Sequence, residues 1–290
     1  MSDASEATEP EVLTSVNADG VAEITLNRPD RMNAFTWRMG RLLNDALGRF
    51  NDDDDVRAII VTGKGKAFCA GADLGRGGKT FDRGGRTGEA SKPAQPDAGP
   101  VRPEERLNPW DVRKPIIAAI NGAAVGVGLT IPLQYDMRIV ATDAKLGFVF
   151  VNRGIIPELA STWILPRLIG TARASDLLLS GRIFRGEEAA EFGICNEAVD
   201  REDVLPRARE IARHIAVHSA PVSVALTKKM IWDNLAQPDI ARVQAREAPL
   251  FAWTGSQPDS REGVLSFLEK RDPEWKMKVG KDTPELPPID

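Results

Sequence analysis

The stretch that decides the fold reads Lys114-Pro-Ile-Ile-Ala-Ala-Ile-Asn-Gly-Ala-Ala-Val-Gly-Val-Gly128. Its apolar first half predicts a buried strand over residues 115–120, and the periodicity that follows predicts a helix over residues 127–134. The glycines between them permit unusual backbone angles and a close approach to the main chain. Because the first N–H groups of a helix are unpaired, such a turn can bind an anion or polarise a carbonyl.

A second glycine-rich turn lies N-terminal to the one just described. Residues 57–62 predict another buried strand, which leads through Gly63-Lys-Gly-Lys66 into Ala67-Phe-Cys-Ala-Gly-Ala-Asp-Leu74. Each turn alone is a weak signal, since glycine turns are common structural punctuation. Together they predict two sets of N–H donors that converge on one oxygen atom.

Composition narrows the classes of protein that the chain can belong to. With 290 residues and 42% hydrophobic content, we expect a globular, cytoplasmic protein, either one large domain or a core with an appendage. No apolar run approaches the roughly 20 residues of a membrane helix, and the formal charge of -4 argues against a nucleic-acid partner. Two cysteines, Cys69 and Cys195, are too few for a disulfide framework or a structural zinc site. Cys69 is expected to pack as a small apolar residue.

The order of elements predicts an α/β fold. Strands are expected over residues 22–26, 57–62, 115–120 and 137–141, and helices over residues 35–50, 127–134 and from near Pro157 to about Ile169. We divide the chain into a disordered tail (1–11), a core (12–203) that contains a flexible insertion (75–103), and a helical region (204–290). The insertion follows the second glycine turn, which makes it a candidate lid.

Several familiar motifs are excluded. Gly78-Lys79-Thr80 imitates the end of a phosphate-binding loop, but Asp73 stands where the required earlier glycine belongs. No G-x-S-x-G elbow is present, and the two histidines, His214 and His218, lie one turn apart on an expected helix without a third ligand nearby. We therefore expect no metal site and no serine–histidine catalysis.

Short motifs are spread over nearly the whole chain. They are Leu26-Asn-Arg-Pro29 with Asn33-Ala34, Lys66-Ala-Phe-Cys-Ala-Gly-Ala-Asp-Leu74, residues 114–122, Gly126-Val-Gly128, Asp136, Gly154-Ile-Ile-Pro157, Leu165-Pro-Arg-Leu-Ile-Gly170, Leu179-Ser-Gly181, Ala189-Ala-Glu-Phe-Gly193, Glu262-Gly and Phe267-Leu-Glu-Lys270. In these motifs the chain resembles the crotonase superfamily, the enoyl-CoA hydratases and isomerases.

The resemblance implies a spiral of repeated ββα units with a C-terminal helical region that assembles trimers, or hexamers made of two trimers. It implies an acyl-CoA thioester as substrate and no tightly bound cofactor. It places the two N–H groups of an oxyanion hole at Ala72 and Val127. It places contacts with coenzyme A at Arg28, Arg31, Ala34, Lys66, Ala70, Asp73 and Leu74.

The chain departs from the hydratase pattern at two places. Hydratases similar to this chain generally use two glutamates, and here those places hold Thr130 and Phe150, which cannot transfer a proton near neutral pH. Glu158 matches the sole acid/base of enzymes that resemble the peroxisomal type of Δ3,Δ2-enoyl-CoA isomerase. A carboxylate in an apolar pocket is expected to have a raised pKa, and one base suffices to shift a double bond.

Other interpretations stay open at this stage. Glu158 could instead interact favourably with a helix dipole, and the apolar surroundings of Phe150 and Trp163 fit an acyl pocket or ordinary core packing. A hydratase could use Glu158 alone, or with a water molecule held by Thr130. A non-catalytic acyl-CoA-binding protein is the alternative of another class.

Overall fold

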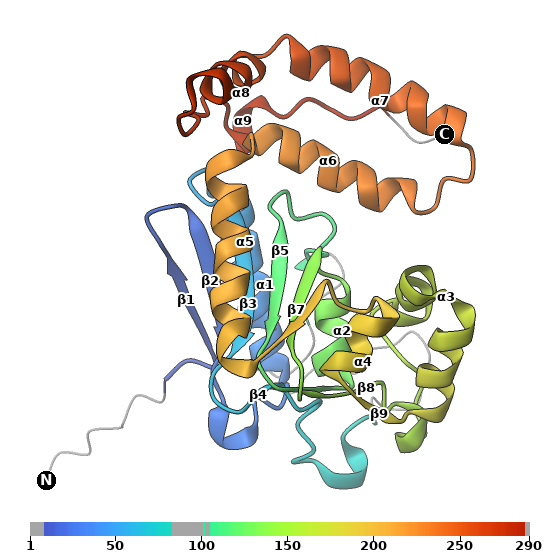
Figure 1. Ribbon diagram of the computed structural model, residues 1–290. Helices are drawn as coiled ribbons and strands as arrows, with labels where there is room; N and C mark the ends of the chain where they lie inside the picture. The colour runs from blue at the N-terminus through green and yellow to red at the C-terminus, as the bar shows by residue number, and fades with distance from the viewer. Residues whose placement is uncertain (1–8, 83–100, 102–104, 288–290) are drawn as a thin grey trace, which may run out of the picture.

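The computed structural model describes residues 9–82, 101 and 105–287, and its main feature is a large, mostly parallel sheet (Figure 1). The strands of this sheet lie in the order β1-β2-β3-β5-β7-β10. All neighbours from β2 to β10 pair in parallel, whereas β1 pairs antiparallel with β2. Their bounds are β1 Val12–Val16, β2 Val21–Leu26, β3 Ala58–Gly63, β5 Ile116–Ile120, β7 Met137–Ala141 and β10 Glu197–Val199.

A second sheet of four short strands lies beside the first. Its order is β4-β6-β8-β9, with β4 Ala67–Cys69, β6 Ala123–Val125, β8 Lys145–Gly147 and β9 Ile183–Arg185. The chain passes repeatedly from a strand of the large sheet to one of the small sheet, as β3 to β4, β5 to β6 and β7 to β8. This alternation confirms the α/β class and the expected spiral of ββα units.

Helices cover the sheets and extend beyond them. α1 (Trp37–Asp52) connects the parallel strands β2 and β3 and forms a βαβ unit with them, and α2 (Val127–Leu133) follows β6. The other helices before the C-terminal segment are α3 (Ser161–Ser180), which is interrupted at Gly170, and α4 (Gly186–Phe192). α3 was expected to begin near Pro157 and to end at about Ile169. The structure starts it later, at Ser161, because Leu159 and Ala160 have left-handed backbone angles.

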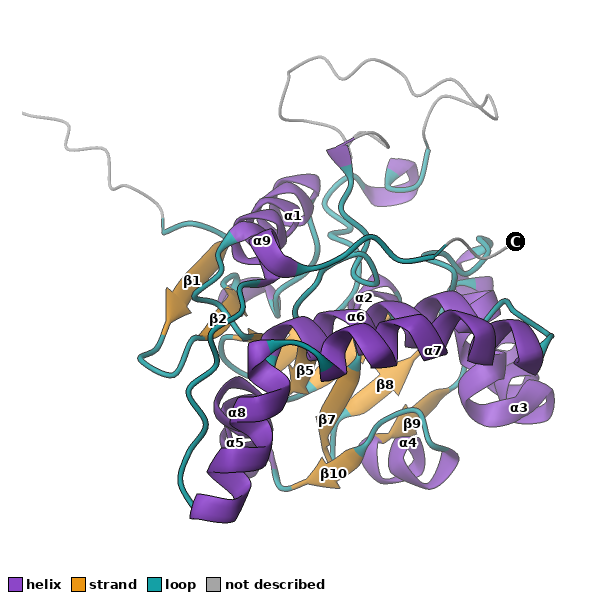
Figure 2. Ribbon diagram, turned by 90° about the horizontal axis from the view of Figure 1, so that it is seen from above, coloured by secondary structure: helices purple, strands orange, loops and turns teal. Residues whose placement is uncertain are grey.

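The described chain from Val204 onward is helical, as expected. It forms α5 (Val204–His218), α6 (Pro221–Asn234), α7 (Ile240–Gly255), α8 (Pro258–Glu269) and the short α9 (Val279–Asp282). α5 packs directly on the large sheet through buried residues such as Ala208 and Ala212. The later helices lie across one end of the molecule, with α6 and α7 side by side (Figures 1 and 2).

The core fills the space between the sheets, α1 and α5. Every residue of β5 is buried, as is typical of a parallel strand covered on both faces. The stretch from Lys114 to Gly128 therefore forms the centre of the large sheet, one strand of the small sheet and the start of α2. Most of the insertion proposed as a lid lies outside the described residues; of residues 75–82, Gly77–Lys79 form a short 3-10 turn.

Candidate active site

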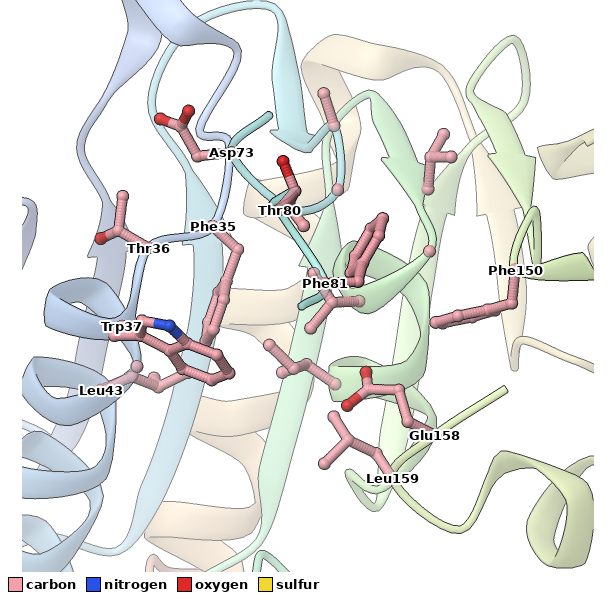
Figure 3. Close-up of a pocket in the computed structure, with 18 of the residues that line it drawn as sticks. Phe35, Thr36, Trp37, Leu43, Asp73, Thr80, Phe81, Phe150, Glu158 and Leu159 are labelled. Atoms are coloured by element: carbon pink, nitrogen blue, oxygen red, sulfur yellow. The ribbon is translucent and has the colours of Figure 1, made fainter. Parts of the chain in front are cut away.

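A cavity of about 750 Å³ opens where the two glycine turns meet. Figure 3 shows Phe35 and Trp37 on one side of it and Phe150 and Glu158 on the other, with Phe81 between them. Its walls come from the start of α1, the loop after β4, the start of α2 and the segment before α3. The cavity is mostly apolar, so it suits an acyl chain with a few polar groups at the reacting end.

The N–H of Ala72 faces this cavity because of a single bridge between two loops. Ala72 pairs with Phe35 in parallel orientation: Phe35 N–H donates to Gly71 O (2.7 Å), and Asp73 N–H donates to Phe35 O (2.9 Å). Since successive N–H groups of an extended chain point to opposite sides, the N–H of Ala72 points away from Phe35. Among the described residues it has no backbone or side-chain acceptor.

The N–H of Val127 is the second donor that borders the cavity. Val127 is the first residue of α2, and Gly126 before it caps the helix with φ 55°. An N–H at this helix position has no partner within the helix, and no other described residue accepts from it. Ala72 and Val127 both line the cavity, so the structure brings together the two predicted donors.

Glycine is required where the two turns pack against β4. A Cβ atom on Gly128 would lie 2.0 Å from the carbonyl oxygen of Cys69, and one on Gly122 would lie 2.2 Å from that of Lys66. The main chains therefore touch directly at both places. This contact fixes the loop that carries Ala72 relative to the helix that carries Val127.

Glu158 points into the cavity from the segment before α3 (Figure 3). Thr130 on α2 donates a hydrogen bond to Glu158 Oε1 (3.0 Å), and Ser161 donates to the Glu158 carbonyl through its N–H (3.1 Å) and its hydroxyl (2.7 Å). The next residues, Leu159 and Ala160, have φ angles of 54° and 56°. Consecutive left-handed residues that are not glycine are strained, and such strain is concentrated at functional sites.

The other predicted pocket residues separate into two groups. Phe150 is 5% exposed and its ring borders the cavity, whereas Thr130 is fully buried behind Glu158. Trp163 was expected in the acyl pocket, but it lies on α3 and lines a different cavity, of about 530 Å³. The Arg167 guanidinium stacks on its ring at 3.8 Å from the centroid. That placement follows from the later start of α3.

Five of the predicted coenzyme A residues lie close together beside the cavity. Arg28 donates to Asp73 Oδ2 (2.9 Å) and also to the carbonyl of Ala34, while Ala70 and Leu74 line the cavity on the same loop as Asp73. The N–H of Gly75, together with Arg28, lowers the pKa of Asp73, which stays ionised.

The remaining two predicted coenzyme A residues, Arg31 and Lys66, are exposed and do not line the cavity. They lie on the turns that flank it, since Arg31 adjoins the Asn33–Ala34 turn and Lys66 precedes β4. Both are thus placed as surface cations.

Some lining residues were not foreseen from the sequence. Trp37 and Phe81 are partly exposed aromatic residues at the cavity, and Tyr135, the single tyrosine of the chain, is buried between the two cavities. Burial raises the pKa of Tyr135, so its hydroxyl stays protonated. Trp37 lies outside the apolar stripe of α1. A tryptophan on the exposed side of a helix was the feature of the sequence that could have indicated a cavity-lining residue here.

Other reactive side chains in the described part of the chain are structural. Burial raises the pKa of Cys69 to about 11, so this thiol is protonated and packs as the expected small buried residue. The rings of His214 and His218 are tilted against each other with their centroids 5.0 Å apart, and no group of three or more described His, Cys, Asp or Glu residues is arranged to hold a metal ion. None of the helices in the described ranges has the length and apolarity needed to cross a membrane.

The comparison with known proteins identifies the family. Residues 17–278 match the enoyl-CoA hydratase/isomerase family. The chain belongs to the enoyl-CoA hydratase/isomerase family. This confirms the resemblance to the crotonase superfamily.

Relatives in this family carry both hydratase and isomerase names. The chain is 41% identical to an enoyl-CoA hydratase of Alternaria alternata, over 93% of this chain and 87% of that protein. It is 36% identical to the 1,2-epoxyphenylacetyl-CoA isomerase of Escherichia coli (strain K12), over 92% of this chain and 99% of that protein. A solved structure of a probable enoyl-CoA hydratase/isomerase from Mycobacterium abscessus superposes with a TM-score of 0.83 at 37% identity, covering 92% of this chain and 98% of that one.

Proposed function

We propose that this member of the enoyl-CoA hydratase/isomerase family shifts a double bond of an acyl-CoA thioester from C3 to C2, with Glu158 as its acid/base. The proposal rests on one observation. The Glu158 carboxylate faces the cavity bordered by the Ala72 and Val127 N–H groups, while Thr130 and Phe150 occupy the two places where hydratases resembling this chain have glutamates.

The reaction follows from the chemistry of these groups. The thioester oxygen accepts hydrogen bonds from Ala72 N–H and Val127 N–H, and Glu158 removes a proton from C2. The electron pair of that C–H bond moves into a dienolate, whose negative charge the two N–H groups stabilise. Glu158 then returns the proton at C4, and the double bond lies between C2 and C3. Loss of one such donor typically costs about 3 kcal/mol in the transition state.

No second catalytic group is needed for this reaction. Isomerisation moves one proton and leaves the oxidation state unchanged, so it requires neither a redox cofactor nor an activated water molecule. Asp73 is the other acidic residue among the described lining residues. Its carboxylate is paired with the Arg28 guanidinium, so we do not assign it a role in proton transfer. Phe150 makes that wall of the cavity apolar, which disfavours the addition of water.

In this proposal coenzyme A is part of the substrate and no cofactor is tightly bound. Arg28 joins the turn that carries Ala34 to the loop that carries Ala70, Asp73 and Leu74 beside the cavity. Arg31 and Lys66 supply positive charge for phosphates on the flanking surface.

The test is to incubate the protein separately with 3-hexenoyl-CoA and crotonyl-CoA in deuterated water and to identify the products by mass spectrometry and NMR. We expect conjugated 2-enoyl product from the first substrate, with deuterium confined to C2 and C4. A 3-hydroxyacyl product from crotonyl-CoA would make the protein a hydratase instead. Tight binding of coenzyme A with no product from either substrate would favour a binding protein.

The Glu158→Gln variant tests the assigned base. Turnover of 3-hexenoyl-CoA should fall about 10²–10⁴-fold, which is the usual contribution of a general acid/base. Glu187→Gln is the matched control, because Glu187 is an exposed residue of α4 away from the cavity. If the folded Glu158→Gln protein turns over at the rate of the control, Glu158 is not the base.

A further inference from the structure

The hydroxyl of Thr130 joins two parts of the site. Thr130 is fully buried on α2, and its Oγ1 lies 3.0 Å from Glu158 Oε1 and 3.5 Å from the carbonyl oxygen of Val127. A hydroxyl has one proton to donate, and an ionised carboxylate accepts a stronger hydrogen bond than a neutral carbonyl. The shorter distance is also to the carboxylate. Thr130 therefore connects Glu158 to the helical turn that begins with the Val127 N–H.

The backbone of Glu158 is fixed independently of this contact. Its carbonyl accepts two hydrogen bonds from Ser161, and the left-handed angles of Leu159 and Ala160 set the direction in which the chain enters α3. The side chain still has three torsions between this backbone and the carboxylate. Its orientation in the cavity thus depends on the contacts of the carboxylate itself.

We propose that Thr130 is a positioning residue that holds the Glu158 carboxylate at a fixed position relative to the Val127 N–H, the proposed oxyanion donor. The proposal deepens the isomerase function and rests on it. It gives a role to the threonine that stands where hydratases resembling this chain have a glutamate, since a donor there orients the one remaining base. Thr130 does not line the cavity, so it acts through Glu158 and not on the substrate.

A donor hydroxyl has a second, measurable effect. A hydrogen bond to the ionised form of a carboxylate favours that form and lowers its pKa. Removal of the hydroxyl should therefore raise the pKa of the catalytic base and move the rising limb of the pH–rate profile to higher pH. A threonine that only packed in the core would have no such effect.

The experiment compares Thr130→Val, which keeps the shape and removes the hydroxyl, with Thr130→Ser, which keeps the hydroxyl. For Thr130→Val we expect the rising limb of kcat against pH to move up by about one unit, a tenfold change in ionisation. We expect kcat at its plateau to fall about tenfold, with KM within about twofold, because substrate contacts are unchanged. Thr130→Ser should restore the original profile.

Thr62→Val is the matched control for loss of a buried threonine hydroxyl. Thr62 is 5% exposed on β3, away from the cavity, and donates to the carbonyl of Ala119 at 2.9 Å. This variant should lose stability but keep the pH–rate profile of the original protein. It separates the effect of a lost core hydrogen bond from an effect on the base.

The outcomes decide between distinct conclusions. A Thr130→Val profile that superimposes on the original, or a Thr130→Ser profile displaced as far as that of Thr130→Val, would overturn the role of Thr130. If Thr130→Val does not fold, Thr130→Ala is measured in its place with the same expectation. Failure of the isomerase function is recognised separately, by the absence of 2-enoyl product when the original protein is incubated with 3-hexenoyl-CoA, and failure of the base assignment by full turnover of Glu158→Gln.

Discussion

At the residue scale, Lys114 is a buried cation outside the candidate active site. It is 1% exposed, and its Nζ has no hydrogen-bond partner among the described residues. Burial lowers the pKa of Lys114 from 10.5 to about 8, and the nearby Asp54 only partly opposes this shift. The unfolded chain therefore binds more protons than the folded protein between about pH 8 and 10.5, and this lysine makes stability rise with pH in that window.

We predict that Lys114→Met is more stable than the original protein by about 1–2 kcal/mol at pH 7, because the cost of a buried charge disappears. The difference should shrink as pH rises from 8 towards 10, where the folded original loses the charge as well. Urea unfolding at several pH values measures it. Lys145→Met, at an exposed position of β8, is the control and should show no such trend. A stability difference that is independent of pH would contradict the prediction.

Gly128 gives a second prediction at this scale. A methyl group there would lie 2.0 Å from the Cys69 carbonyl, so Gly128→Ala should lower the free energy of unfolding by about 3 kcal/mol. Gly48→Ala is the matched control, because a Cβ at Gly48 in α1 meets nothing within 4 Å. That change should stabilise the protein by about 0.5–1 kcal/mol. Equal effects of the two substitutions on the urea midpoint would refute the close packing at Gly128.

Individual residues also show how far sequence reasoning reaches. Ala72, Val127 and Glu158 were placed at one site from the sequence, and the structure brings all three to one cavity. The hydrogen bond between Thr130 and Glu158 could not be foreseen, since 28 positions separate them and only tertiary packing joins them. Trp163 was misplaced because it follows Glu158 closely in the chain, whereas the left-handed turn directs it elsewhere.

At the element scale, the turn before α3 is the least regular part of the site. Leu159 and Ala160 adopt the left-handed region without glycine, at a cost of roughly 1–2 kcal/mol each. No residue type in this segment signals such a turn, so the sequence pattern extended the helix back to Pro157. The carbonyl of Glu158 and its two bonds from Ser161 replace the missing helical turn.

Substitutions at Ala160 test this turn. Ala160→Gly should stabilise the protein by about 0.5–1 kcal/mol and retain turnover, because glycine adopts this angle without strain. Ala160→Val should lose about 2 kcal/mol and most of its turnover, since a β-branched residue is disfavoured at positive φ and its backbone shift would move Glu158. Thermal unfolding and turnover of 3-hexenoyl-CoA measure both. A valine variant as active and stable as the glycine variant would rule out the role of this turn.

The strands that were predicted have five or six residues each, whereas β1, also of five residues, and the three-residue strands were not predicted. Buried strands such as β3 and β5 were recognised from continuous apolar runs, and the start of α2 from its glycine cap. The strands of the small sheet have three residues each, too few to show any periodicity. Their existence followed only from the family resemblance.

At the scale of the whole molecule, the C-terminal helices expose large apolar side chains. Phe251 is 81% exposed on α7, and Phe267 is 82% exposed on α8. Apolar surface of this kind on a folded chain indicates an interaction surface. It supports the expectation that the helices after α5 assemble subunits.

We predict that the protein is a trimer or a pair of trimers, with a molar mass in solution of three or six times 31.6 kDa. Phe251→Asp combined with Phe267→Asp should shift the mass measured by light scattering towards one subunit. Leu179→Asp, an equally exposed apolar position on α3, is the control and should keep the assembly. A monomer in the original protein would exclude assembly through these helices.

The bridge between Phe35 and Ala72 bears on how this family can diverge. Because the groups proposed to hold the thioester oxygen are main-chain atoms, random replacement of the Ala72 or Val127 side chain should often be silent in a selection for activity. Replacement of their neighbours Gly71 and Gly126, whose φ angles are 107° and 55°, should be lethal in the same selection although neither supplies a reacting atom. In a distant relative that has lost the activity, the inactivating substitutions should therefore be found at these glycines, which carry no reactive side chain.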